Sequence, residues 1–276
     1  MAWTFTTELD ELPPAADAWL RGDPTRNTVA LTVLARGRSG LWGGGAMAGW
    51  YADGESVRGV VLHTPPYQLL VPDIPLDIVP SLAEALRDLP LPGVGGPRAQ
   101  AEAYLSAAGR TEASRMSMRM YRLAELRPHS ATGAARRAGP GDLDLAAGWM
   151  RDFLLEAEPE NADDPYPQTR ARIGAGELVL WEDAGRPVAM AAFSTPIAGM
   201  SRVGPVYTPP EHRKHGYGSA VTHAVSRAAK DAGATSVLLF TDLANPTSNA
   251  IYQALGYRPL TDYATIFFAA GDRPAG

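Results

Sequence analysis

The chain has 276 residues, of which 45% are hydrophobic, and it carries a formal net charge of −5 at pH 7. These values are typical of a folded protein with one large or two ordinary domains, and they argue against a general nucleic-acid binder. Cysteine is absent, which excludes disulfides, thiolate zinc sites and a cysteine nucleophile.

Residues 1–126 are predicted to form a first domain of short strands and helices. Asp53-Gly54 is a hairpin turn signal between two apolar runs, and Ser81 with Glu84 resembles a capping box at the start of a helix. Gly109 is predicted to end the helix at 98–109. The patterns predict strands at 30–36, 47–51, 56–64, 67–71 and 117–126, helices at 80–89 and 98–109, and a loop at 91–97.

Residues 127–141 are rich in proline, glycine and small side chains, and we interpret them as the joint between two domains. From residue 142 the order of elements repeats, which predicts a second domain over 142–276. Its predicted helices lie at 142–158, 164–176, 218–233 and 245–256, its hairpin at 177–196, and its strands at 200–208, 235–243 and 263–270. The predicted fold class is α/β, with a central, mostly antiparallel mixed sheet flanked by helices in each domain.

The stretch RKHGYG, residues 213–218, lies between a predicted strand and a predicted helix. The first turn of a helix has unpaired N–H groups and a partial positive charge, and glycines there let an anion approach the backbone. The arrangement therefore predicts a diphosphate cradle. The spacing fits neither a Walker A loop nor the GxGxxG fingerprint of dinucleotide-binding folds.

These residues resemble the R/Q-x-x-G-x-G/A signature of the GNAT N-acetyltransferases. The preceding VYTPPEHR, residues 206–213, is similar to the central strand of that family and its approach to the loop. The later NPTSNAIYQALGYRP, residues 245–259, resembles the N…lYeklGF element. The resemblance covers about residues 140–270. It implies a site for acetyl-CoA as acyl-donor substrate.

The resemblance also implies which residues act. Tyr252 corresponds to the tyrosine that protonates the leaving thiolate, and Asn245, Asn249 and Tyr252 share one face of their helix by spacing. The residues expected to bind acetyl-CoA are Val206, Tyr207, Thr208, Arg213, Lys214, His215, Gly216, Tyr217, Gly218, Ser219, Asn245 and Asn249. A simpler interpretation of Tyr252 is a core aromatic residue with an idle hydroxyl.

The general base is left open, with Asp242, Glu156 and Glu158 as the nearest carboxylates. No two histidines lie at a metal-ligand spacing with nearby carboxylates, so no metal is expected. The segment 64–77 of the first half occupies the place of the strand and loop but has no R-x-x-G-x-G. The first half resembles the degenerate N-terminal half of tandem GNAT proteins, which implies two GNAT-like domains in tandem, of which the first is expected not to bind CoA.

The predicted function is transfer of acetyl from acetyl-CoA to a primary amine by direct attack in a ternary complex. The alternatives are a non-catalytic acyl-CoA-binding or sensing module, and transfer of a longer acyl group. The acceptor would be a small-molecule or peptide amine, and a homodimer is left open.

The first residues lack the apolar core of a signal peptide, and no apolar run reaches the length of a membrane span. We therefore expect a cytoplasmic protein without a membrane or nucleic-acid partner. Lys214 and Lys230 are the only lysines, which indicates a GC-rich bacterial source.

Overall fold

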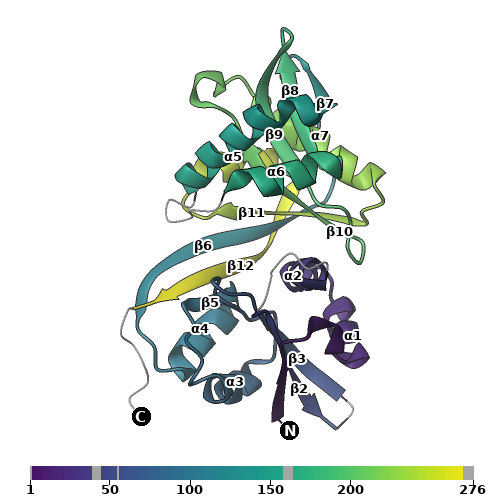
Figure 1. Cartoon of the computed structure of the whole chain (residues 1–276). Helices are drawn as coiled ribbons and strands as arrows, with labels where there is room; N and C mark the ends of the chain where they lie inside the picture. Colours follow the sequence, from purple (N-terminus) through teal and green to yellow (C-terminus); the bar gives the residue numbers. More distant parts are fainter. Residues whose placement is uncertain (1, 39–44, 55, 158–163, 270–276) are drawn as a thin grey trace. The chain divides into compact units, whose positions relative to one another are not determined.

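The computed structural model describes residues 2–38, 45–54, 56–157 and 164–269. The described chain divides into two compact units that are discontinuous in sequence (Figure 1). The first comprises the residues up to Met120, Asp242–Ala244 and the described residues from Thr261 onward, and the second comprises Tyr121–Thr241 and Asn245–Leu260. The predicted ranges 1–126, 127–141 and 142–276 are contiguous, and they differ from these units in two ways. Residues 242–244 and 261–269 join the first unit, and residues 121–126 together with the predicted joint 127–141 join the second.

The first unit is a mixed sheet with helices packed on it. Its strands follow the order β1-β2-β3-β4-β5-β12, where β12 is Tyr257–Phe268, with β4 parallel to β5 and β5 antiparallel to β12. Helices α3 and α4 bury Val79, Leu82 and Tyr104 against these strands in one hydrophobic cluster. The elements are β1 (Ala2–Thr6), α1 (Pro14–Gly22), α2 (Thr28–Arg38), β2 (Met47–Asp53), β3 (Ser56–His63), β4 (Leu69–Leu70), α3 (Val79–Ala85), β5 (Gly93–Pro97), α4 (Arg98–Ala107) and β6 (Glu112–Leu123).

Three predictions for this unit are wrong. Ser81 and Glu84 do not form a capping box, because the N-cap of α3 is Ile78 and the Ser81 hydroxyl donates to the Ile78 carbonyl oxygen. Residues 30–36, predicted as a strand, lie within helix α2, where Ala30, Leu31 and Leu34 form a buried face at helical spacing. Residues 93–97 of the predicted loop 91–97 form strand β5. Its glycines allow neighbouring backbone segments to come close to the strand. A Cβ on Gly93 would lie 2.2 Å from the Ile266 carbonyl oxygen, and one on Gly96 would lie 2.0 Å from that of Val71.

The second unit is a sheet covered on both faces. The strands follow the order β11-β10-β9-β8-β7, and the last residues of β6 belong to the same unit. One cluster packs α7 and α8 against the strands, and a separate cluster packs α5 and α6 on the opposite face (Figure 1). The elements are β7 (Ala134–Arg137), α5 (Leu143–Ala157), α6 (Pro165–Gly174), β8 (Leu178–Asp183), β9 (Arg186–Phe193), β10 (Met200–Tyr207), α7 (Tyr217–Asp231), β11 (Ser236–Asp242), α8 (Pro246–Ala254) and β12 (Tyr257–Phe268).

The two halves of the chain have the same order of elements. A strand, two helices, three strands, a helix, a strand, a helix and a final strand occur from β1 to β6 and again from β7 to β12. In each half the third of the three consecutive strands runs parallel to the strand after the next helix, as β4 with β5 and β10 with β11. This repeated order is that of a duplicated unit.

Replacement of Gly256 should lower the stability of the second unit strongly. This glycine follows α8 with φ of +99°, and a Cβ there would lie 1.8 Å from the backbone oxygen of Glu125. We expect Gly256→Ala to lower the free energy of unfolding by about 2–4 kcal/mol, because the clash is with backbone that cannot rotate away.

Gly233→Ala is the matched control for this experiment. Gly233 ends α7 in the same way, with φ of +92°, but nothing lies within 4 Å of its Cβ position. Its replacement should cost about 1–2 kcal/mol from the left-handed conformation alone. Urea denaturation of both variants measures the difference, and equal losses would refute the proposed clash.

Candidate functional site: a split strand pair and a glycine-rich helix start

The central feature of the second unit is a parallel pair of strands that stays paired only at its beginning. Strands β10 and β11 are in register from Met200 with Ser236 to Val203 with Leu239, although both strands continue beyond these residues. From Val203 to Val206, β10 gains one residue relative to β9, and it then remains paired with β9 through Tyr207. The bulge lets β10 remain hydrogen-bonded to β9 after its pairing with β11 has ended. The open end of this split leads directly into the loop before α7.

The start of α7 presents backbone N–H groups without a side-chain cap. Gly216 is the N-cap residue, with φ of +81° and no side-chain hydrogen bond to the first turn. Lys214 also has a positive φ, of 67°. A Cβ on Gly218 would be 3.4 Å from the Thr208 hydroxyl oxygen. The absence of a side chain at Gly218 therefore leaves the backbone open to close approach by a ligand. Because the first N–H groups of a helix have no partner within it, this is a site suited to an anion.

Arg213, predicted to bind the diphosphate, is held by an acidic residue of α5. Its guanidinium donates hydrogen bonds to both carboxylate oxygens of Glu156, at 2.7 and 2.8 Å, and its Nε donates to the Thr208 carbonyl at 2.9 Å. The same guanidinium lies 5.9 Å from the ring centre of Tyr207. Arg213 therefore anchors the loop to α5 and β10. The charge that Arg213 could offer an anion is already paired.

Tyr217 attaches the start of α7 to the hairpin between β8 and β9. Its hydroxyl donates a 2.7 Å hydrogen bond to Asp183, which raises the pKa of Tyr217 and lowers that of Asp183. His215 stacks on the Tyr217 ring, with centroids 5.5 Å apart. The side chain of Tyr217 thus has a structural role, and its backbone N–H is the part available to a ligand.

The predicted asparagines of α8 are used within the unit. Asn245 caps the helix by accepting a 3.0 Å hydrogen bond from the Ser248 N–H. The Asn249 side chain donates to the Asn245 carbonyl at 2.7 Å and accepts from the Tyr121 hydroxyl at 2.9 Å. Direct contact of these side chains with the pantetheine arm would need them to change partners, and their binding role stays a prediction.

Tyr252 is 9% exposed and packs among the core residues of the second unit. Its ring meets that of Tyr257 edge to face, with centroids 6.2 Å apart. Burial raises the pKa of Tyr252 to about 12, against a smaller opposing effect of a hydrogen bond with the Ser248 side chain. The phenol is therefore neutral and able to donate a proton at physiological pH.

The candidate bases are engaged in different ways. Glu156 is paired with Arg213, and the Asp242 carboxylate accepts a 2.8 Å hydrogen bond from the Ala244 N–H. Glu158 lies outside the described residues. Within the described part of the chain, no group of three or more His, Asp or Glu residues could hold a metal ion.

Sequence reasoning missed the partners that hold the site together. Tyr121 lies 128 residues from Asn249, and Glu156 lies 57 residues from Arg213. No local motif signals a contact over such separations. The sequence predicts a hairpin over residues 177–196, but it carries no signature of the hydrogen bond between Asp183 and Tyr217.

Residues 145–257 match the model of the Acetyltransferase (GNAT) family. This part of the chain is therefore a GNAT domain, which confirms the resemblance drawn from residues 213–218 and 245–259. Acyl transfer is the general chemistry of that family. No curated protein matches the sequence.

Several solved structures share the fold along nearly the whole chain. An acetyltransferase of the GNAT family from Colwellia psychrerythraea has a TM-score of 0.66 at 12% identity, covering 98% of this chain and 100% of that one. A GCN5-related N-acetyltransferase from Sphaerobacter thermophilus has a TM-score of 0.59 at 17% identity, covering 96% and 95%. A tandem GNAT protein from the clavulanic acid biosynthesis pathway has a TM-score of 0.58 at 12% identity, covering 97% and 98%. The mixed α/β fold in two GNAT-like halves is thus confirmed.

Proposed function

We propose that the second unit binds acetyl-CoA and transfers its acetyl group to a primary amine by direct attack. The observation that carries this proposal is the parallel pair β10–β11, which separates after Val203 and opens onto the glycine-rich start of α7. A split strand pair offers unpaired backbone groups to an extended chain such as pantetheine, and the helix start offers N–H groups to a diphosphate.

The backbone of the site supplies most of the proposed contacts. The N–H groups of residues 214–219 would hold the diphosphate, and the backbone of residues 206–208 would hold the pantetheine arm. The oxyanion that develops on the carbonyl needs an N–H donor from β10. Pro205 has no N–H, so Val206 or Tyr207 is the nearest donor after the bulge.

In the proposed reaction a neutral amine attacks the thioester carbonyl. The C–N bond forms, the C–S bond breaks, and the sulfur takes a proton from the Tyr252 phenol. A base must remove one proton from the amine, directly or through water. Of the carboxylates named above, Glu156 is the described one within the second unit, and it could do so only after releasing Arg213.

A thiol-release assay tests this function. The purified chain is mixed with acetyl-CoA and a panel of small amines, amino acids and peptides, and free thiol is followed over time. Amine-dependent release supports transfer, while tight binding of acetyl-CoA without release for any acceptor would favour the non-catalytic binding module. Repeating the assay with propionyl- and butyryl-CoA decides whether a longer acyl group is preferred.

We further expect one CoA site per chain. In the first unit the helix after the parallel strand, α3, has Ile78 as its N-cap and Val79 as its first residue, which are 2% and 1% exposed, and its first turn has no glycine. The side chains at the start of α3 are thus buried and apolar, whereas a diphosphate needs accessible backbone N–H groups there. Calorimetric titration of the full chain with CoA should give a stoichiometry of one. A value of two would overturn the assignment of the first unit as a non-binding domain.

A further inference from the structure

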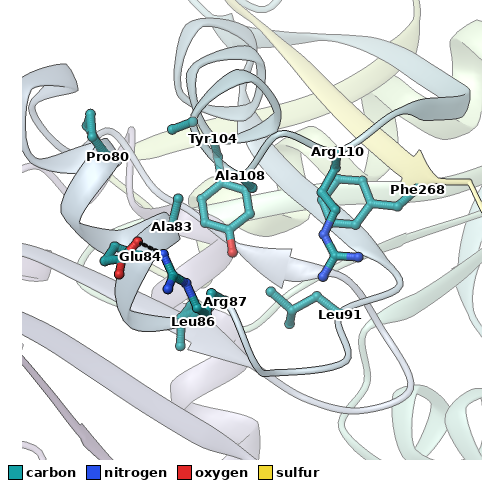
Figure 2. A pocket seen from close by; sticks show the side chains of 11 residues that line it. Pro80, Ala83, Glu84, Leu86, Arg87, Leu91, Tyr104, Ala108, Arg110 and Phe268 are labelled. Atoms are coloured by element: carbon teal, nitrogen blue, oxygen red, sulfur yellow. Dashed lines mark hydrogen bonds and ion pairs between the residues drawn. The ribbon is translucent and has the colours of Figure 1, made fainter. Parts of the chain in front are cut away.

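The first unit contains a cavity of about 110 Å³ at the adjoining C-terminal ends of α3 and α4 (Figure 2). It lies within that unit alone and uses none of the residues proposed for acetyl-CoA. Apolar side chains from α3, the loop before β5 and the end of β12 form much of its wall. Leu86, Leu91 and Phe268 are the largest of them.

A buried phenol points into this cavity. Tyr104 is 2% exposed, and Figure 2 shows its hydroxyl directed into the space between Arg87, Leu91 and Arg110. No hydrogen bond joins this hydroxyl to the described residues. Burial raises its pKa to about 12, so the group is a neutral donor at physiological pH. An unpaired polar group in a largely buried residue favours a ligand that can accept a hydrogen bond.

The two arginines of the lining differ in their partners. Arg87 forms an ion pair with Glu84 one turn before it, so its charge is compensated. Arg110 lies over the Phe268 ring, 5.8 Å from its centre, and has no carboxylate partner among the described residues. The C-terminal ends of α3 and α4 add partial negative charge. An anion would therefore depend on direct contact with Arg110 and Tyr104.

We propose that this cavity binds a small monocarboxylate with an apolar body. Its carboxylate would accept hydrogen bonds from Arg110 and Tyr104, and its apolar part would contact Leu86 and Leu91. An apolar cavity of about 150 Å³ holds the six heavy atoms of benzene, so a space of about 110 Å³ suits the apolar body of a short branched acid, with about three or four carbon atoms. The proposal is independent of acetyl transfer by the second unit.

Isobutyrate is the probe for this site, and isobutyramide is its uncharged isostere. Amide chemical shifts of the full-length protein are followed at pH 7 while each compound is added to 50 mM. We expect saturable shifts with isobutyrate in the segments around Arg87, Tyr104 and Arg110, and at least about fivefold weaker binding of isobutyramide because it lacks the charge. No saturable shifts there, or equal affinity for the amide, would overturn the proposal.

Three variants assign the contacts. Arg110→Gln should weaken isobutyrate binding at least about fivefold, and Tyr104→Phe should weaken it by about threefold or more. Arg87→Gln, which removes a guanidinium already paired with Glu84, is the matched control and should change affinity less than about twofold. If Arg87→Gln has the larger effect, or if isobutylamine binds in place of the acid, the proposed recognition by Arg110 is wrong. Retained amide spectra show that each variant is folded.

Discussion

Replacement of Gly218 by Glu is expected to weaken acetyl-CoA binding at least about tenfold, or roughly 1.4 kcal/mol. A Cβ at this position would be 3.4 Å from the Thr208 hydroxyl oxygen, so a longer side chain must extend over the first turn of α7. The introduced carboxylate would also repel the diphosphate where the helix N-terminus attracts it. Calorimetry with CoA measures the change.

Gly22→Glu is the control for charge, because it adds the same side chain to an open position at the end of α1 in the first unit. It should leave CoA affinity unchanged. Circular dichroism of both variants checks that the fold is intact. A folded Gly218→Glu variant that binds CoA as tightly as the native chain would show that the start of α7 is not the diphosphate site.

Replacement of Tyr252 by Phe should lower kcat by about 10- to 1000-fold and leave acetyl-CoA binding nearly unchanged. The substitution keeps the ring that packs against Tyr257 and removes only the hydroxyl. With the pKa of this phenol at about 12, the group is protonated throughout the working range of pH and can supply the proton that the leaving thiolate needs. Steady-state kinetics on an identified acceptor, with a parallel binding titration, measures the effect.

The hydroxyl of Tyr257 provides the matched control. It lies in the same core and exchanges a 2.7 Å hydrogen bond with Ser226. Tyr257→Phe removes a buried phenol oxygen from the same core and leaves the proposed proton donor in place, so it should affect stability and not kcat. Near-native kcat of the Tyr252→Phe variant, with chemistry shown to be rate-limiting, would leave Tyr252 as a core residue and water as the proton source.

Much of the second unit could be predicted because its local signals agree with its fold. Asn245 and Pro246 mark the start of α8, Asp183 to Gly185 mark a hairpin, and the strand before residues 213–218 is followed by a helix. In the first unit the local signals were ambiguous. The run 30–36 is apolar enough for a strand, and only its burial at helical spacing identifies α2. The glycines of β5 are typical of a loop, whereas here they allow close backbone contact within a sheet.

The candidate site was predictable as a motif but not as a network. The role of Gly216 and Gly218 can be predicted from the local sequence, because these glycines act through backbone geometry. The pairing of Arg213 with Glu156 depends on how α5 packs on β10, which no spacing in the sequence encodes. The same holds for Tyr121, which engages the side chain of Asn249. Long-range side-chain partners thus account for most of what sequence reasoning missed.

A crystal structure of the chain with acetyl-CoA tests the central claim most directly. We predict the diphosphate on the N–H groups of residues 214–219 and the pantetheine arm in the split between β10 and β11. We also predict the thioester sulfur within hydrogen-bond reach of the Tyr252 hydroxyl. Acetyl-CoA bound elsewhere in the second unit, or only in the first unit, would contradict the account.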